Sequence, residues 1–255
     1  MEGHPDFIKE QRRILWRKNL IKNNIDEKRH LFYTFIKNTN TIQDTTLAVI
    51  NADIPRTFPN ESECKPYMNT IKSLLISYAS FQKGDAYLQG FNYIMTITYM
   101  VFKDTTDGEA DTWWCFSAII GLIRPLMPDF NVTWFHWLRK YWMTELHNKL
   151  RVKRPTLNSI LENESDTWSS LITVKWFMIW FAQTVHYKDL FKLWDFFISL
   201  PPEKLMLAYT DITINILYEV APEITYQWTQ RPTNILHTLL NIKVDGIDAI
   251  IAKKY

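Results

Sequence analysis

The chain has 255 residues, of which 47% are hydrophobic and 15% aromatic. This apolar content can form a sizeable core, and it excludes a disordered chain. The 29 basic and 27 acidic residues leave a net charge of +2, so bulk charge gives no reason to expect nucleic acid or an anionic membrane as the main partner.

The residue types that usually hold cofactors are scarce. The six glycines form neither GxGxxG nor GxxxxGK[ST], which excludes a nucleotide site built on a glycine-rich loop. Two cysteines, Cys64 and Cys115, cannot make a disulfide scaffold or a four-ligand zinc site, and the six histidines form no HExxH motif. We therefore expect no metal and no cofactor of the chain's own. If a nucleotide is involved, another protein holds it.

The sequence also predicts a cytosolic protein. The first residues lack the apolar segment of a signal peptide, and the most apolar stretch, 91–102, is too short to cross a bilayer as a helix. Free thiols are compatible with a reducing compartment.

Helical periodicity dominates the chain from its first half onward. In 65–82 apolar residues recur at steps of three and four, which predicts a helix with one buried face. Segment 109–123 begins with acids, which suit the positive end of a helix, and is then almost wholly apolar. Segment 168–181 is apolar on nearly every side, which predicts a helix buried in the centre of the fold.

Further helices are predicted at 131–149, 188–199, 203–220, 232–242 and 246–254. Several of them are expected to begin with a proline in the first turn, namely at Pro201-Pro202, Pro222 and Pro232. Strand signals are thin, because the chain has no Asn-Gly or Gly-Gly hairpin and no sustained alternation. The sequence therefore predicts an all-α fold.

The best candidate for a division is the break at 124–130, which gives two helical halves, about 1–128 and 129–255. No linker composition accompanies this break, so we expect the halves to pack as one domain. A basic stretch at 12–22 is interspersed with acids nearby, which favours a solvated helix face over a contact with anionic lipid. The tryptophans are expected in the core, because few of them lie beside clustered Lys or Arg as nucleic-acid binding requires.

One polar segment, 50–59, combines two prolines with an arginine. The prolines stiffen the segment and should keep the residues before them, Ile54 and Phe58, out of helical geometry. Arg56 follows Asp53 by three residues, so a carboxylate can orient its guanidinium for an external anion. Taken alone, these residues favour a simpler interpretation, a local ion pair on a surface loop.

A second polar segment, 87–92 (YLQGFN), precedes the apolar run at 91–102. Gln89 should lie at or just before a helix start, where an amide often satisfies free backbone N–H groups, and Asn92 could do the same. The functional interpretation is a neutral amide that holds a water molecule or a partner's backbone. By itself this signal is weak.

Together the two segments read IxxDxPRTxP and YxQGxN, and this combination resembles the TBC domain, the family of GTPase-activating proteins for Rab GTPases. The segment from Arg12 to Trp16 resembles the family's first signature, and Gly3-His4-Pro5 resembles its usual opening. In the second half, WFMIWFA at 176–182 and LWDFF at 193–197 resemble the family's WF…F and LWDxxF segments. The resemblance covers about residues 3–254, with Phe91 in place of the usual Met as a departure.

The resemblance implies a role for each polar residue. Arg56 is then the arginine finger that enters the GTPase, and Gln89 the glutamine finger that orients the attacking water in place of the GTPase's own glutamine. Asp53 is expected to orient the finger loop. The expected supports are Thr57, Tyr87 and Asn92. Arg12 and Trp16 are expected to be mainly scaffold, with a weaker expectation that they, Arg12 above all, contact the partner.

The implied partner is a Rab-family small GTPase in its GTP-bound form, which carries the GTP and Mg²⁺. The chain would then have no hydrolase activity alone, would regulate vesicle trafficking, and would meet membranes at most peripherally, through the GTPase. The alternative is a non-catalytic helical module that binds a small GTPase as effector or scaffold. The presence of both Arg56 and Gln89 favours the catalytic interpretation.

Overall fold

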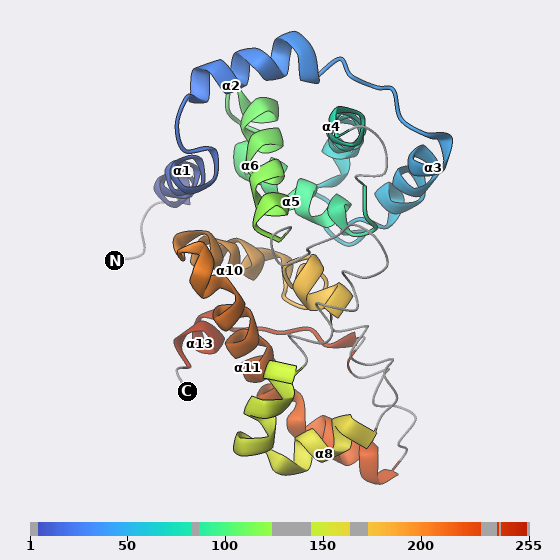
Figure 1. Cartoon of the computed structure of the whole chain (residues 1–255), viewed down its shortest axis with the longest axis vertical. Helices are drawn as coiled ribbons and strands as arrows, with labels where there is room; N and C mark the ends of the chain where they lie inside the picture. Colours follow the sequence, from blue (N-terminus) through green and yellow to red (C-terminus); the bar gives the residue numbers. More distant parts are fainter. Residues whose placement is uncertain are drawn as a thin grey trace. The chain divides into compact units, whose positions relative to one another are not determined.

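The computed structural model describes residues 5–82, 87–123, 144–163, 173–230, 239 and 241–253. Its regular structure in these ranges is helical, apart from an isolated parallel bridge between Val185 and Val244, which confirms the all-α prediction (Figure 1). The residues group into two compact units, Met1–Leu122 and Ile123–Tyr255. The predicted border near residue 128 lies in 124–143, outside the described residues.

The first unit is built from α-helices joined by short π- and 3₁₀-helical turns (Figure 1). Its elements are α1 (Pro5–Trp16), η1 (Arg17–Ile21), α2 (Ile25–Leu31), η2 (Phe32–Ile36), α3 (Asp44–Asp53), η3 (Ile54–Arg56), η4 (Lys65–Tyr67), α4 (Met68–Phe81), α5 (Phe91–Phe102) and α6 (Gly108–Ile123). Helix α5 packs against α4 and α1, and α3 packs against α4. Helix α5 is buried along nearly its whole length. Packing therefore fixes the position of its first turn, beside the residues that follow α3.

Two predicted helices of this unit are confirmed. The segment 65–82 forms η4 and α4, and four residues on its predicted face, Ile71, Leu74, Leu75 and Tyr78, are buried, whereas Tyr67 is half-buried and Phe81 is exposed. The segment 109–123 forms α6. The ring of Tyr78 meets the rings of Phe91, Trp113 and Phe116 edge-on or tilted, with centroids 4.8–6.3 Å apart. Aromatic packing of this kind joins α4, α5 and α6 into one core.

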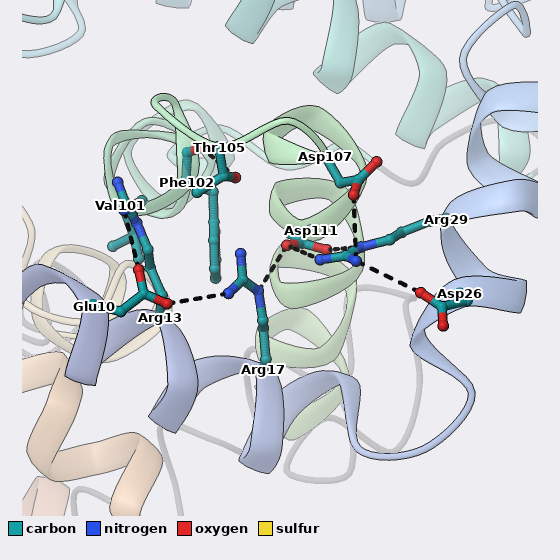
Figure 2. Close-up of polar contacts among 10 residues, drawn as sticks. All are labelled: Glu10, Arg13, Arg17, Asp26, Arg29, Val101, Phe102, Thr105, Asp107 and Asp111. Atoms are coloured by element: carbon teal, nitrogen blue, oxygen red, sulfur yellow. Dashed lines mark hydrogen bonds and ion pairs between the residues drawn. The ribbon is translucent and has the colours of Figure 1, made fainter.

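The basic stretch at 12–22 is not a solvated face, and that prediction is wrong for Arg13 and Arg17. Arg13 Nε donates to the carbonyl oxygen of Val101 at 2.9 Å, and Arg17 Nε donates to the Asp111 carboxylate at 2.8 Å. Figure 2 shows both side chains directed from α1 and η1 toward α5 and α6. Their side chains are 13% and 22% exposed, so the charges tie helices together rather than face solvent.

The second unit has its own helices and core. Its elements are a helix at 144–153, α8 (Pro155–Asn163), the π-helix η6 (Thr173–Met178), α10 (Tyr187–Ser199), α11 (Pro202–Gln230) and α13 (Ile247–Ala252). The helices predicted at 188–199 and 246–254 are confirmed as α10 and α13, and α11 covers 203–220. Of the predicted helices at 131–149 and 232–242, residues 131–143, 232–238 and 240 lie outside the described residues.

Two predictions for this unit are wrong. Segment 168–181 is deeply buried where it is described, but its helix ends at Met178, and Trp180 and Phe181 have φ angles of 50° and 60°. Tertiary packing of these rings, including the 5.4 Å contact of Trp180 with Trp194, offsets the cost of the left-handed backbone. Pro222 does not begin a helix and lies inside α11. It is exposed, so water can compensate for the hydrogen bond that a proline cannot donate.

Candidate functional site

The site is built around the turn that carries Arg56. Helix α3 ends at Asp53, and the 3₁₀ turn η3 follows directly, closed by a hydrogen bond from Thr57 N to Ile54 O at 3.1 Å. Ile54 has φ −56° and ψ −49°, so the prediction that Pro55 keeps it out of helical geometry is wrong. The prediction holds for Phe58, whose φ is 43°. The arginine therefore ends a rigid turn instead of lying in an extended loop.

The Arg56 guanidinium is held by a buried carboxylate. Its Nη2 and Nε lie 2.6 Å and 3.1 Å from Asp53 Oδ1, which makes charge-assisted hydrogen bonds. The Asp53 side chain is 2% exposed, whereas that of Arg56 is 57% exposed. The pair thus fixes one edge of the guanidinium and leaves a positive charge at the surface, where it can meet an external anion.

The second oxygen of Asp53 binds the other polar segment. Tyr87 Oη donates to Asp53 Oδ2 at 2.7 Å, and the Tyr87 side chain is itself buried. Burial, together with the nearby Asp53 carboxylate, raises the pKa of Tyr87, because both disfavour a phenolate. Tyr87 therefore stays a hydrogen-bond donor, and it joins the segment before α5 to the end of α3.

Asn92 and Thr57 complete this network. Asn92, the second residue of α5, donates from Nδ2 to Thr57 Oγ1 at 2.7 Å and to Asp53 O at 3.4 Å. Thr57 Oγ1 in turn donates to Asp53 O at 2.8 Å. Both side chains are buried. The structure thus brings Asp53, Thr57, Tyr87 and Asn92 together behind Arg56, across up to 39 positions of sequence.

Gln89 lies on the exposed side of the same segment. It is exposed, and it follows the buried Tyr87 by two residues. Gly90 has φ 106°, a left-handed conformation that a glycine adopts without strain, and α5 begins at the next residue. Gln89 is therefore directly before a helix start, where the sequence places it, and its amide is accessible from outside.

The comparisons with known proteins give the family. The model of the Rab-GTPase-TBC domain matches residues 9–224, which is most of the chain. The chain belongs to the Rab-GTPase-TBC domain family. Among solved structures, the Ypt/Rab-GAP domain of Gyp1p superposes with a TM-score of 0.72 over 98% of this chain and 86% of that chain, at 16% identity. At this identity the likeness shows the fold.

Curated relatives are similarly distant in sequence. Growth hormone-regulated TBC protein 1 of Xenopus tropicalis is 25% identical over 58% of this chain and 42% of its own length. TBC1 domain family member 17 of Homo sapiens is 24% identical over 58% and 22%, and GTPase-activating protein GYP7 of Candida glabrata is 22% identical over 72% and 23%. The chain thus spans less than half of the length of these relatives.

The two further candidates of this TBC domain lie on α1. Trp16 is fully buried and meets the ring of Phe102 edge-on at 6.4 Å, so it offers no surface to a partner, and the weaker expectation of a partner contact is wrong for this residue. Its other interpretation, as scaffold, fits this position. Arg12 is half-buried on the same helix, and a contact with a partner remains a prediction for it.

Sequence reasoning missed one residue of the site. Tyr93 Oη donates to the carbonyl oxygen of Arg56 at 3.1 Å. No motif marks this tyrosine, and the 37 positions between the two residues hide the contact. Its position next to Asn92, on a helix start that already binds the turn with Arg56, is the signal that could have indicated it.

The described residues hold no group of three or more His, Cys, Asp or Glu side chains that could bind a metal ion. Across the same ranges, none of the helices combines the length and the apolar character that a membrane crossing requires.

Proposed function

We propose that this chain stimulates GTP hydrolysis by a Rab-type small GTPase, with Arg56 as the arginine finger and Gln89 as the glutamine finger. The observation that carries the proposal is the exposed Arg56 guanidinium, bound through Nε and Nη2 to the buried Asp53. The printed names of relatives support it, since one is a GTPase-activating protein and the solved structure is a Ypt/Rab-GAP domain.

The chemistry requires a positive charge from outside the GTPase. Negative charge on the phosphate oxygens must be stabilised in the transition state, and an arginine supplied in trans accelerates hydrolysis by about 10³–10⁵. Gln89 would orient the attacking water from the activator's side. The GTPase, in its GTP-bound form, would bring the nucleotide and Mg²⁺, so the chain needs no cofactor and hydrolyses no GTP alone.

The network behind the fingers suits this task. Because Asp53 holds the guanidinium before the partner arrives, less ordering remains to be done when the complex forms. Tyr87 binds the same carboxylate at 2.7 Å, so the turn with Arg56 and the segment with Gln89 are fixed to one buried group. Arg56 would act on the phosphate and Gln89 on the water that attacks it, so a common support helps to keep the two side chains correctly placed.

A non-catalytic module that binds a GTPase as effector or scaffold is the alternative. Such a module has no need of an oriented arginine together with an exposed glutamine. In the cell, we propose a cytoplasmic protein that regulates vesicle trafficking and meets membranes through its GTPase.

The test is a single-turnover measurement of phosphate release with a panel of GTP-loaded Rab proteins. Wild type should stimulate at least one of them, and Arg56→Ala should lower that stimulation about 10³-fold. Arg151→Ala is a matched control, because Arg151 is a similarly exposed arginine, 64% exposed, in an ion pair with Glu162 at 3.3 Å. Binding of GTP-loaded Rab without stimulation by wild type would favour the non-catalytic alternative.

A further inference from the structure

The backbone of the finger residue has its own support. Tyr93, the third residue of α5, donates from Oη to the carbonyl oxygen of Arg56 at 3.1 Å. The ring of Tyr93 also meets the ring of Phe58 edge-on, with centroids 5.0 Å apart and an interplanar angle of 82°. One side chain thus contacts the finger residue and the residue two positions after it.

The backbone at this point is strained and changes direction. Thr57 is extended, with φ −78° and ψ 113°, and Phe58 follows with φ 43°. A left-handed conformation of a bulky residue costs free energy, and the surrounding contacts must offset that cost. Phe58 is 8% exposed, so its ring is held in the core beside Tyr93 while the backbone turns.

The other members of the network act elsewhere. Asp53 binds the guanidinium of Arg56, Thr57 and Asn92 both donate to the carbonyl oxygen of Asp53 at the end of α3, and Asn92 also donates to the Thr57 side chain. The position of a long side chain's charged end depends on its backbone as well as on its far partner. Tyr93 holds the backbone end of Arg56.

We propose that Tyr93 is a positioning residue for the arginine finger, acting through the Arg56 carbonyl group and through Phe58. This inference rests on the proposed function. Tyr93 is then part of the site because it sets where the guanidinium stands when the transition state forms, and not because it touches the nucleotide.

The variant Tyr93→Phe tests the hydroxyl and keeps the ring against Phe58. Loss of one neutral hydrogen bond should lower kcat of stimulated hydrolysis about three- to tenfold, with KM unchanged. Binding should be affected differently for the two nucleotide states of the Rab. Affinity for a Rab loaded with GDP and aluminium fluoride, a transition-state analogue, should fall by the same factor, while affinity for the same Rab loaded with a non-hydrolysable GTP analogue should stay unchanged.

The matched control is Tyr99→Phe, on the same helix. Tyr99 lies six residues further along α5, and its ring packs against that of Tyr67 with centroids 5.5 Å apart, so this variant also removes one phenolic hydroxyl but does not alter the turn that carries Arg56. We expect wild-type kcat from it, and thermal unfolding of both variants shows that each is folded.

Equal loss of affinity for both nucleotide states would overturn the inference, because a direct contact with the GTPase or a general structural role has that effect. Wild-type kcat in Tyr93→Phe would overturn it too. If wild type itself stimulates no Rab, the proposed function fails and the inference falls with it.

Discussion

At the scale of single residues, the exposed charge of Arg56 takes its direction from the buried charge of Asp53. The guanidinium offers two nitrogens to Asp53 Oδ1, at 2.6 Å and 3.1 Å, while its side chain remains 57% exposed. An ammonium group is a single point of charge on a flexible stem and cannot bind the carboxylate in this way while it also reaches an anion. Geometry as well as charge should therefore matter at this position.

We predict that Arg56→Lys loses nearly as much stimulated hydrolysis as Arg56→Ala, about 10³ or more. Binding of the GTP-loaded Rab should be largely retained, because an arginine finger acts mainly in the transition state. Single-turnover phosphate release and equilibrium binding with both variants check this. Activity of Arg56→Lys within about tenfold of wild type would contradict a need for the guanidinium.

The role proposed for Gln89 predicts that the partner tolerates the loss of its own catalytic glutamine. If Gln89 positions the water, a Rab with its own catalytic glutamine changed to leucine should still be stimulated substantially. Gln89→Ala should remove this stimulation and leave binding in place. Single-turnover phosphate release with both forms of the Rab measures how much stimulation Gln89→Ala loses.

The unmutated Rab provides the control for that experiment. Full activity of Gln89→Ala on the unmutated Rab would show that Gln89 is only a contact at the start of α5 and not a glutamine finger. The exposed position of Gln89, directly before Gly90 and α5, fits either role geometrically, so kinetics must decide between them.

The sequence predicts some contacts of the site and hides others. The pair Asp53 and Arg56 is three residues apart, and this spacing alone indicates the ion pair. The bond from Tyr87 to Asp53 spans 34 positions, and the resemblance to a family indicates it where local spacing cannot. Tyr93 lies in no motif, so its contact with Arg56 emerges from the three-dimensional arrangement.

At the scale of elements, a buried carboxylate joins α6 to η1 and α2. Asp111 is fully buried, and its oxygens accept hydrogen bonds at 2.8 Å from Arg17 and from both Nε and Nη2 of Arg29. Figure 2 shows the two guanidinium groups converging on it. The hydrogen bond with Asp111 is the main cause that raises the pKa of Arg29. The two guanidinium groups offset the cost of burying the Asp111 charge, which would be high if that charge were buried alone.

We predict that Asp111→Asn lowers the free energy of unfolding by about 3–5 kcal/mol, since it removes the buried charge that both arginines bind and leaves them only the more exposed carboxylates of Glu10, Asp26 and Asp107. Urea titration followed by circular dichroism measures the change. Asp26→Asn is the control, because Asp26 is 93% exposed and lies 3.7 Å from the same Arg29, and an exposed pair of this kind contributes little. A similar loss in both variants would contradict a special role for burial.

Element boundaries could be predicted where one face of a helix is apolar, and not where distant contacts decide. The stripe at 65–82 predicts α4 because Ile71, Leu74 and Tyr78 recur on one face. The inward direction of Arg17 depends on Asp111, which lies 94 positions away. The end of η6 before Trp180 depends on how aromatic rings pack around it, and no local turn residue marks it.

At the scale of the whole molecule, the candidate site is confined to one part of the chain. All its residues, from Asp53 to Tyr93, belong to the unit Met1–Leu122. The second unit has a separate aromatic core around Tyr209, whose ring lies 4.5–6.1 Å from those of Phe177, Trp180, Phe181 and Phe197. The all-α class follows from periodicity along the whole chain, whereas the arrangement within each unit depends on contacts that the sequence pattern does not specify.

Two buried thiols allow the opening of the first unit to be followed in the intact protein. Cys64 and Cys115 are both fully buried, and burial raises the pKa of Cys115, so its reactive thiolate is scarce at neutral pH. We predict that neither thiol of the native protein reacts promptly with an aromatic disulfide reagent. Labelling should require opening of the structure.

The position of Cys115 makes this prediction specific. It lies one helical turn after Asp111 on α6, so loosening the contacts of that carboxylate with Arg17 and Arg29 should expose it more often. Asp111→Asn should therefore label Cys115 faster than wild type does, while Asp26→Asn should match wild type. Mass spectrometry of the labelled peptides separates Cys115 from Cys64. Prompt modification of Cys115 in the folded wild-type protein would contradict its burial, and an unchanged rate in Asp111→Asn would show that the buried charge does not hold α6 in place.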